Sequence, residues 1–188
     1  MDRPDPDSEP HPLEHLLDLA RAALVAAVDG RPAPVPDPRA HPEMAGLADA
    51  FVTLTADEDL RGCMGTLGAE MRVGEAVVRA AGMAATRDPR FRPVAAGELA
   101  GLRIEVSVLG PPRPLADPAD FVAGRDGIVV EARGRRALLL PQVATEMGWG
   151  ATAMLDAVCE KAGLATGAWR ERGTRLLVFE VERASGPA

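Results

Sequence analysis

Residues 50–67, "AFVTLTADEDLRGCMGTL", decide how this chain folds. A run that contains several apolar residues lies on each side of three consecutive acidic residues, Asp57–Asp59, and this arrangement is typical of two β-strands joined by a turn. The second run also carries an arginine, two glycines and one of the chain's two cysteines. The segment therefore predicts a pair of strands with a candidate site on the second strand.

Helices are expected on both sides of this pair of strands. Over residues 13–30, apolar side chains recur at helical spacing, and Gly30 provides a C-terminal stop. They recur again over residues 72–88, where the helix must end because Pro89 disfavours helical geometry in the residue before it. A Pro-rich strap, residues 31–42, is expected to run over the surface as an extended connector.

The second half of the chain adds strands, a hairpin and a helix. Residues 102–108 alternate apolar and polar side chains, the pattern of a half-buried strand. Residues 127–141 predict a hairpin that turns near Arg133–Gly134. A helix over 150–163 and a last strand over 175–182 follow. This order lacks the regular alternation of a doubly wound sheet, so it predicts an α+β fold with mainly antiparallel sheets.

The expected elements fit one domain over residues 13–183. Residues 1–12 are acidic and Pro-rich and are expected to be a disordered tail, and residues 184–188 a short C-terminal tail.

The composition indicates which classes of molecule this protein is expected to bind. The formal net charge is −7, Tyr is absent, and aromatic residues make up 3% of the chain. Nucleic acids are therefore not expected as partners, because phosphate backbones call for basic patches and exposed bases for aromatic platforms. The N-terminus lacks a basic, apolar leader and no stretch is long and apolar enough to span a bilayer, so we expect a cytoplasmic protein with reduced thiols and no membrane partner.

Cys63 is the first candidate for catalysis. Arg61 lies two residues before it, and Gly62 and Gly65 allow close approach of the backbone. The three histidines all precede the first strand, and of these His41, at the end of the strap, is the one able to fold back over the thiol. The alternative is that Cys63 is a small apolar residue of a strand, as Cys159 is expected to be on its helix.

Residues 86–93, "TRDPRFRP", place three arginines around a proline turn. They are suited to bind a carboxylate or a phosphate. The alternative is an internal ion pair of Arg87 or Arg90 with Asp88, Glu98 or Glu105. Glu105, in the middle of its strand, is a candidate general base or an arginine partner.

Two further candidates follow the hairpin. Gln142 and Glu146 are four residues apart, so one helical turn would place both on the same face, and Trp149 could wall a pocket. The sequence contains no CxxC pair, HExxH motif or dense His/Cys cluster, and no phosphate-binding loop or nucleophile elbow. No metal or cofactor is therefore predicted.

Taken in order, several of these stretches resemble the AMMECR domain family, whose prokaryotic members are called AmmeMemoRadiSam system protein A. The resemblance rests on "FVTL", "LRGCMGTL", "RDPRF", "IEVSVLGPP", "GIVV" and "LLLPQVATEMGW", and it covers about residues 13–181. It implies a two-lobed α+β fold with a cleft between the lobes near the "RGC" block. The family has no established activity, and its name reflects association with a Memo-type protein and a radical SAM protein.

The resemblance also selects site residues. Cys63 and Glu105 lie on these blocks, and from their own chemistry we predict catalytic roles for both. The residues that we predict to bind a substrate or anion, which also lie on these blocks, are Arg61, Gly62, Gly65, Thr66, Arg87, Arg90, Ser107, Gln142 and Trp149.

Two functions stay open at this point. The first is an enzyme, or a substrate-handling subunit, that acts on a small anionic molecule with Cys63 as nucleophile or redox thiol. The second is a non-catalytic adaptor that recruits or regulates the Memo-type and radical SAM proteins, which the missing base and missing metal ligands favour.

Overall fold

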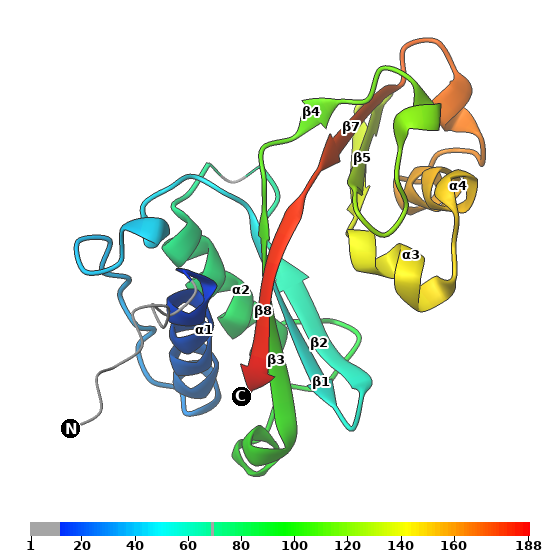
Figure 1. Ribbon diagram of the computed structural model, residues 1–188. Coiled ribbons are helices and arrows are strands. Elements are labelled where there is room, and N and C mark those ends of the chain that lie inside the picture. The colour runs from blue at the N-terminus through cyan, green and yellow to red at the C-terminus, as the bar shows by residue number, and fades with distance from the viewer. Residues whose placement is uncertain (1–11, 69) are drawn as a thin grey trace, which may run out of the picture. The chain divides into compact units, whose positions relative to one another are not determined.

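The computed structural model describes residues 12–68 and 70–188, which form two compact units (Figure 1). The first unit consists of the chain up to Val108 together with residues Glu182–Ala188. The second unit is Leu109–Val181. Each unit contains one four-stranded antiparallel sheet with helices, which confirms the predicted α+β class.

The sheet of the first unit has the strand order β2-β1-β3-β8. Its strands are β1 (Ala50–Ala56), β2 (Asp59–Gly65), β3 (Leu102–Leu109) and β8 (Val181–Pro187). The predicted turn between the first two strands is confirmed, with positive φ angles at Asp57 and Glu58. A short 3-10 helix, Ala96–Gly101, leads into β3.

Two helices cover one face of this sheet, α1 (Pro12–Val28) and α2 (Val73–Thr86), as Figure 1 shows. Alternate side chains of the strands point toward them because successive residues of a strand face opposite sides. The core between sheet and helices is fully apolar and includes Val52, Leu54, Val77, Ile104 and Val106, each 0% exposed. The opposite face of the sheet therefore carries the residues between these apolar ones.

The strap between α1 and β1 is held against the first unit at its far end. There a 3-10 helix, Pro42–Met44, buries Met44 in the core. Gly74 in α2 allows the strap to come close, since a Cβ at this position would lie 2.8 Å from the Cβ of Pro36. Both contacts fix the path of the strap over α2.

The second unit has the strand order β4-β7-β5-β6. Its strands are β4 (Arg113–Pro114), β5 (Gly127–Ala132), β6 (Arg135–Leu139) and β7 (Arg175–Phe179). The predicted hairpin is confirmed, and Arg133 and Gly134 both have the positive φ that a tight two-residue turn requires.

Two α-helices belong to the second unit, α3 (Pro141–Met147) and α4 (Ala151–Lys161), together with 3-10 turns at Pro118–Asp120 and Ala168–Arg170. Helix α4 packs on β5 and β6. Cys159, which is fully buried on this helix, is a core residue as predicted.

The structure corrects one element. The last strand, predicted as continuous over 175–182, is divided at Glu180 into β7 and β8, which belong to different sheets. The local pattern cannot reveal this division, because both halves are extended and only their pairing partners differ. Strand β8 continues to Pro187, through residues that the sequence assigns to a tail. Of the predicted N-terminal tail, residues 1–11 lie outside the described residues and Pro12 begins α1.

Candidate functional site

Cys63 lies on β2, on the sheet face that α1 and α2 leave uncovered, and is half-buried. The register pairs Thr53 with Cys63 on one side and with Glu105 on the other. The three side chains therefore form a line across three neighbouring strands. The Thr53 hydroxyl donates a hydrogen bond to Cys63 Sγ at 3.4 Å.

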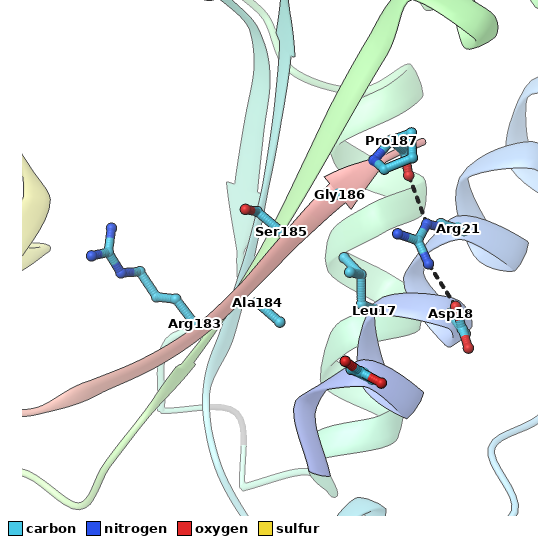
Figure 2. A pocket seen from close by; sticks show the side chains of 9 residues that line it. Leu17, Asp18, Arg21, Arg183, Ala184, Ser185, Gly186 and Pro187 are labelled. Atoms are coloured by element: carbon cyan, nitrogen blue, oxygen red, sulfur yellow. Dashed lines mark hydrogen bonds and ion pairs between the residues drawn. The ribbon is translucent and has the colours of Figure 1, made fainter. Parts of the chain in front are cut away.

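Two more polar side chains extend this line. The Ser107 hydroxyl donates to Glu105 Oε1 at 3.3 Å, and Arg183 Nη1 lies 3.8 Å from Glu105 Oε2. Arg183 belongs to β8, and Figure 2 shows it on the opposite side of that strand from Ala184. We call Cys63, Thr53, Glu105, Ser107 and Arg183 the polar row. It combines a thiol, two hydroxyls, a carboxylate and a guanidinium.

Asp88 joins the "RDPRF" block to the "RGC" block. The backbone N–H of Cys63 donates to Asp88 Oδ2 at 2.8 Å. Arg90 donates to both oxygens of the same carboxylate, Nε at 2.9 Å and Nη2 at 2.7 Å, and its Nη2 also reaches the Cys63 carbonyl at 3.2 Å. The ion-pair alternative for the arginine cluster is thus confirmed for Arg90.

These contacts keep Asp88 ionised although it is buried. The hydrogen bonds from Arg90 are the largest effect and lower the pKa of the Asp88 carboxyl far below its usual range, against the opposing effect of burial. The N–H of Cys63 lowers it further. The hydrogen bonds to Asp88 also raise the pKa of Arg90. The anion that the Cys63 N–H binds is therefore a side chain of this protein.

Arg61 is also engaged. Its Nε and Nη2 bond the two oxygens of Glu98 at 3.0 and 3.2 Å, and its Nη1 bonds the Arg92 carbonyl at 3.0 Å. The Arg61 hydrogen bond, followed by that of the Ala95 N–H, lowers the pKa of Glu98 to about 2. This bidentate pair fastens β2 to the segment that follows α2.

Three more predicted residues belong to the same region. A Cβ added to Gly62 would lie 2.5 Å from the Ala84 carbonyl oxygen, and one added to Gly65 would meet the ring of Phe51. Both positions therefore need glycine because strand and neighbour approach closely. Thr66 extends the pairing with β1, accepting the Ala50 N–H at 3.2 Å.

Arg87 differs from Arg61 and Arg90. It caps the C-terminal end of α2, is exposed, and directly precedes Asp88. Within residues 12–68 and 70–188, it has no side-chain hydrogen bond or ion pair. It is the arginine of the two blocks with its guanidinium available.

Gln142 and Trp149 belong to the second unit. The predicted helical turn is confirmed, since α3 contains both Gln142 and Glu146. Trp149 follows α3, is half-buried, and packs against the core of the second unit. The structure therefore brings the candidate residues from Arg61 to Ser107 together within one unit and places these two in the other.

Sequence reasoning missed Thr53 and Arg183. Thr53 was not recoverable by counting back from the turn, because Asp59 pairs with Ala56 and a register shift between Leu54 and Thr55 sets Thr53 opposite Cys63. Arg183 was not recoverable either, since its place depends on β8 joining the first sheet.

A family profile described as AMMECR1 matches residues 17–184, most of the chain. The chain belongs to the AMMECR1 family. Relatives of this chain include a protein of Methanocella arvoryzae, 42% identical over 73% of this chain and 75% of the relative. A protein of Methanothermobacter thermautotrophicus is 45% identical over 70% of this chain and 72% of the relative.

A solved structure supports the same assignment. The crystal structure of an uncharacterized protein from Pyrococcus horikoshii matches this chain with a TM-score of 0.86 and 35% sequence identity. The match covers 92% of this chain and 90% of that one.

The first unit also has a groove of about 510 Å³ between α1 and β8 (Figure 2). Arg21 occupies one side of it, bonded to Asp18 at 2.6 Å and to the Pro187 carbonyl at 2.6 Å. The groove thus holds an internal ion pair. None of the helices that the structure describes is both long and apolar enough to cross a membrane.

A second group of side chains was not predicted from the sequence. His15, His41 and Glu43 bring their nitrogen and oxygen atoms within 4.8 Å of one another. His41 thus faces Glu43, at 3.6 Å, and not the thiol of Cys63. Burial, the largest effect, would raise the pKa of Glu43, but hydrogen bonds from its own N–H and from His15, with the charges of both histidines, lower it overall.

Proposed function

We propose that this protein binds a small anionic molecule at the polar row, as an enzyme or as a substrate-handling subunit, in a pathway with Memo-type and radical SAM proteins. The observation that carries the proposal is the half-exposed Cys63 thiol, set in line with the Thr53 hydroxyl and the Glu105 carboxylate on the uncovered face of the sheet. An ordinary sheet surface does not require a thiol at this place.

The contacts support the following assignment of roles. Cys63 is the nucleophile or redox thiol, with Thr53 as its hydrogen-bond donor. Glu105 is the base, or the carboxylate that positions Arg183. Arg87 supplies the positive charge for the anion, because Arg61 and Arg90 are already bonded to Glu98 and Asp88.

The test compares two alkylating reagents of similar size, anionic iodoacetate and neutral iodoacetamide, on Cys63 in a Cys159→Ser background. The ratio of the two rates is measured in the folded protein and in urea, which removes the site. An anion-binding site is expected to raise the iodoacetate ratio severalfold in the folded protein, because local positive charge concentrates anions.

Arg87→Gln is expected to abolish this preference. The matched control is Arg172→Gln, which removes the same charge from an exposed position of the second unit. Equal ratios in folded and unfolded protein would sink the proposal and leave Cys63 as a structural thiol.

One observation favours the adaptor as a second candidate. Arg61 and Arg90 use their guanidinium groups on this chain's own carboxylates and carbonyls. On this account the two blocks fix β2 and shape a surface for a Memo-type or radical SAM partner. Isothermal titration with each purified partner tests it: saturable binding that Arg87→Gln weakens and Arg172→Gln does not would support the adaptor, and heat of dilution alone would exclude it.

A further inference from the structure

The first unit contains a compact group of two imidazoles and one carboxylate, in which His15 is far in sequence from His41 and Glu43. His15 lies in the first turns of α1, and Glu43 follows 28 positions later in the 3-10 helix at the end of the strap. His41 directly precedes that helix. We propose that His15, His41 and Glu43 bind one divalent transition-metal ion, with Zn²⁺ as the expected metal.

The spacing of the ligand atoms fits such an ion. Nδ1 of His15 lies 2.8 Å from Glu43 Oε1, and Nδ1 of His41 lies 3.6 Å from the same oxygen. Tetrahedral ligands with metal bonds of about 2.0–2.1 Å stand about 3.3 Å apart. The observed separations lie on either side of this value, so small side-chain adjustments admit the ion.

The metal also accounts for a contact that hydrogen bonding does not explain. The His15 contact is a normal hydrogen bond, but 3.6 Å is too long for one between His41 and Glu43. Yet the two imidazole rings lie together, with centroids 4.2 Å apart, and both direct Nδ1 toward one oxygen. Two nitrogens and a carboxylate oxygen within 4.8 Å of one another are close enough to share one metal ion.

The donor set selects the class of metal. Two imidazoles and one carboxylate suit zinc and other late divalent ions, whereas calcium and magnesium prefer oxygen ligands alone. Three protein ligands leave a further coordination position, and each of the three side chains is between 22% and 34% exposed, which gives the ion a path from solvent.

The fold holds the ligands in place without the metal. Met44, next to Glu43, is buried in the core, and the backbone N–H of His41 donates to the Asp37 carbonyl at 3.0 Å. On the other side, His15 is flanked on α1 by Leu16, a buried core residue. Such preorganisation lowers the cost of binding, and the bound ion would clamp the strap onto α1.

The test is equilibrium dialysis of the full chain against Zn²⁺, with Cys63 and Cys159 both changed to Ser so that thiolates do not contribute. One Zn²⁺ per chain is expected, and His41→Gln and Glu43→Gln should each weaken binding about tenfold or more. Glu58→Gln, which removes one carboxylate from the exposed turn after β1, is the matched control and should leave affinity unchanged.

Co²⁺ provides a second readout. A four-coordinate site gives visible absorption bands, which His41→Gln should remove while circular dichroism shows the variant folded. The inference is overturned if the chain takes up no Zn²⁺, or if His41→Gln and Glu43→Gln bind it as the parent does. It is also overturned if His11→Gln alone abolishes uptake, which would assign the metal to residues outside the described ranges. None of these outcomes depends on the reactivity of Cys63.

Discussion

Among the residues that the structure describes, each unit buries one aspartate, and the two are held differently. Asp126 in the second unit is 0% exposed and bonds Arg125, the residue before it, and the N–H of Val122, four residues earlier. Asp88 in the first unit is 4% exposed and bonds Arg90, two residues later, and the N–H of Cys63, 25 residues earlier. The hydrogen bonds of Asp126 close a local turn, whereas those of Asp88 join distant segments.

The comparison shows that a buried, paired aspartate can serve two structural purposes. A buried carboxylate must be paired and hydrogen-bonded, or it destabilises the fold. In the second unit that need is met by hydrogen bonds within one loop, and Arg113 of β4 adds an ion pair at 3.8 Å. In the first it is met by the strand that carries the candidate thiol, so Asp88 positions Cys63 as well as stabilising the unit.

The largest expected effect comes from removing these carboxylates. Asp88→Ala should lower the free energy of unfolding by about 2–4 kcal/mol, because the Cys63 N–H and Arg90 both lose a charged partner. Asp126→Ala should cost a similar amount. Urea denaturation measures both losses.

Labelling then separates the two variants. In a Cys159→Ser background, Asp88→Ala should speed alkylation of Cys63 under native conditions, and Asp126→Ala should not. Equal labelling in both variants would contradict the positioning role of Asp88.

The next effect concerns the close approach of β2 to α2. Gly62→Ala should destabilise the protein by about 1–3 kcal/mol, because the added methyl group meets the Ala84 carbonyl. Gly97→Ala is the control, since open space surrounds that position, and it should stay within about 0.5 kcal/mol of the parent. Thermal unfolding measures both, and equal melting temperatures would show that β2 can move away from α2.

Acid should weaken the Asp88 contact in a defined direction. The pKa of Asp88 in the folded protein lies far below the ~3.9 of an unfolded chain. Below about pH 4 the unfolded chain therefore binds more protons than the folded protein. For this group, the free energy of unfolding decreases as the pH is lowered, by at most about 1.4 kcal/mol per pH unit. Asp88→Asn should flatten that acid slope in urea titrations, and an unchanged slope would assign the loss to other carboxyls.

The smallest effect is expected at an exposed ion pair of the second unit. Arg133 and Glu171 form an ion pair, and their side chains are 65% and 47% exposed, respectively. Glu171→Gln should cost about 0–1 kcal/mol, because solvent screens such pairs. Urea denaturation again measures it, and a loss as large as that of Asp88→Ala would remove the distinction between buried and exposed pairs.

Much of the fold was predictable because its signals are local. The turn at Arg133–Gly134, the alternation in β3 and the end of α2 before Pro89 each depend on a few neighbouring residues. The division at Glu180 was not predictable, since it reflects pairing with β3 in one sheet and with β5 in the other. Such pairing is a property of the assembled chain.

The candidate site shows the same limit. Cys63, Glu105 and the arginines were found from residue type and from the family blocks. The ion pairs of Arg61 with Glu98 and of Arg90 with Asp88 determine which arginine stays available. These pairs could be assigned only from the structure. The residues His15, His41 and Glu43 form no recognisable sequence motif. His15 is far from the other two in sequence, and only the folded strap brings the three side chains together.

The division at Glu180 also bears on how the protein forms during synthesis. The first unit gains its edge strand, β8, only after the second unit has left the ribosome, so its sheet stays three-stranded until then. Domains usually fold in order from the N-terminus. Here the order is nested: the inner unit has its whole sequence first, and the outer one, with Arg183 and the complete polar row, is finished last.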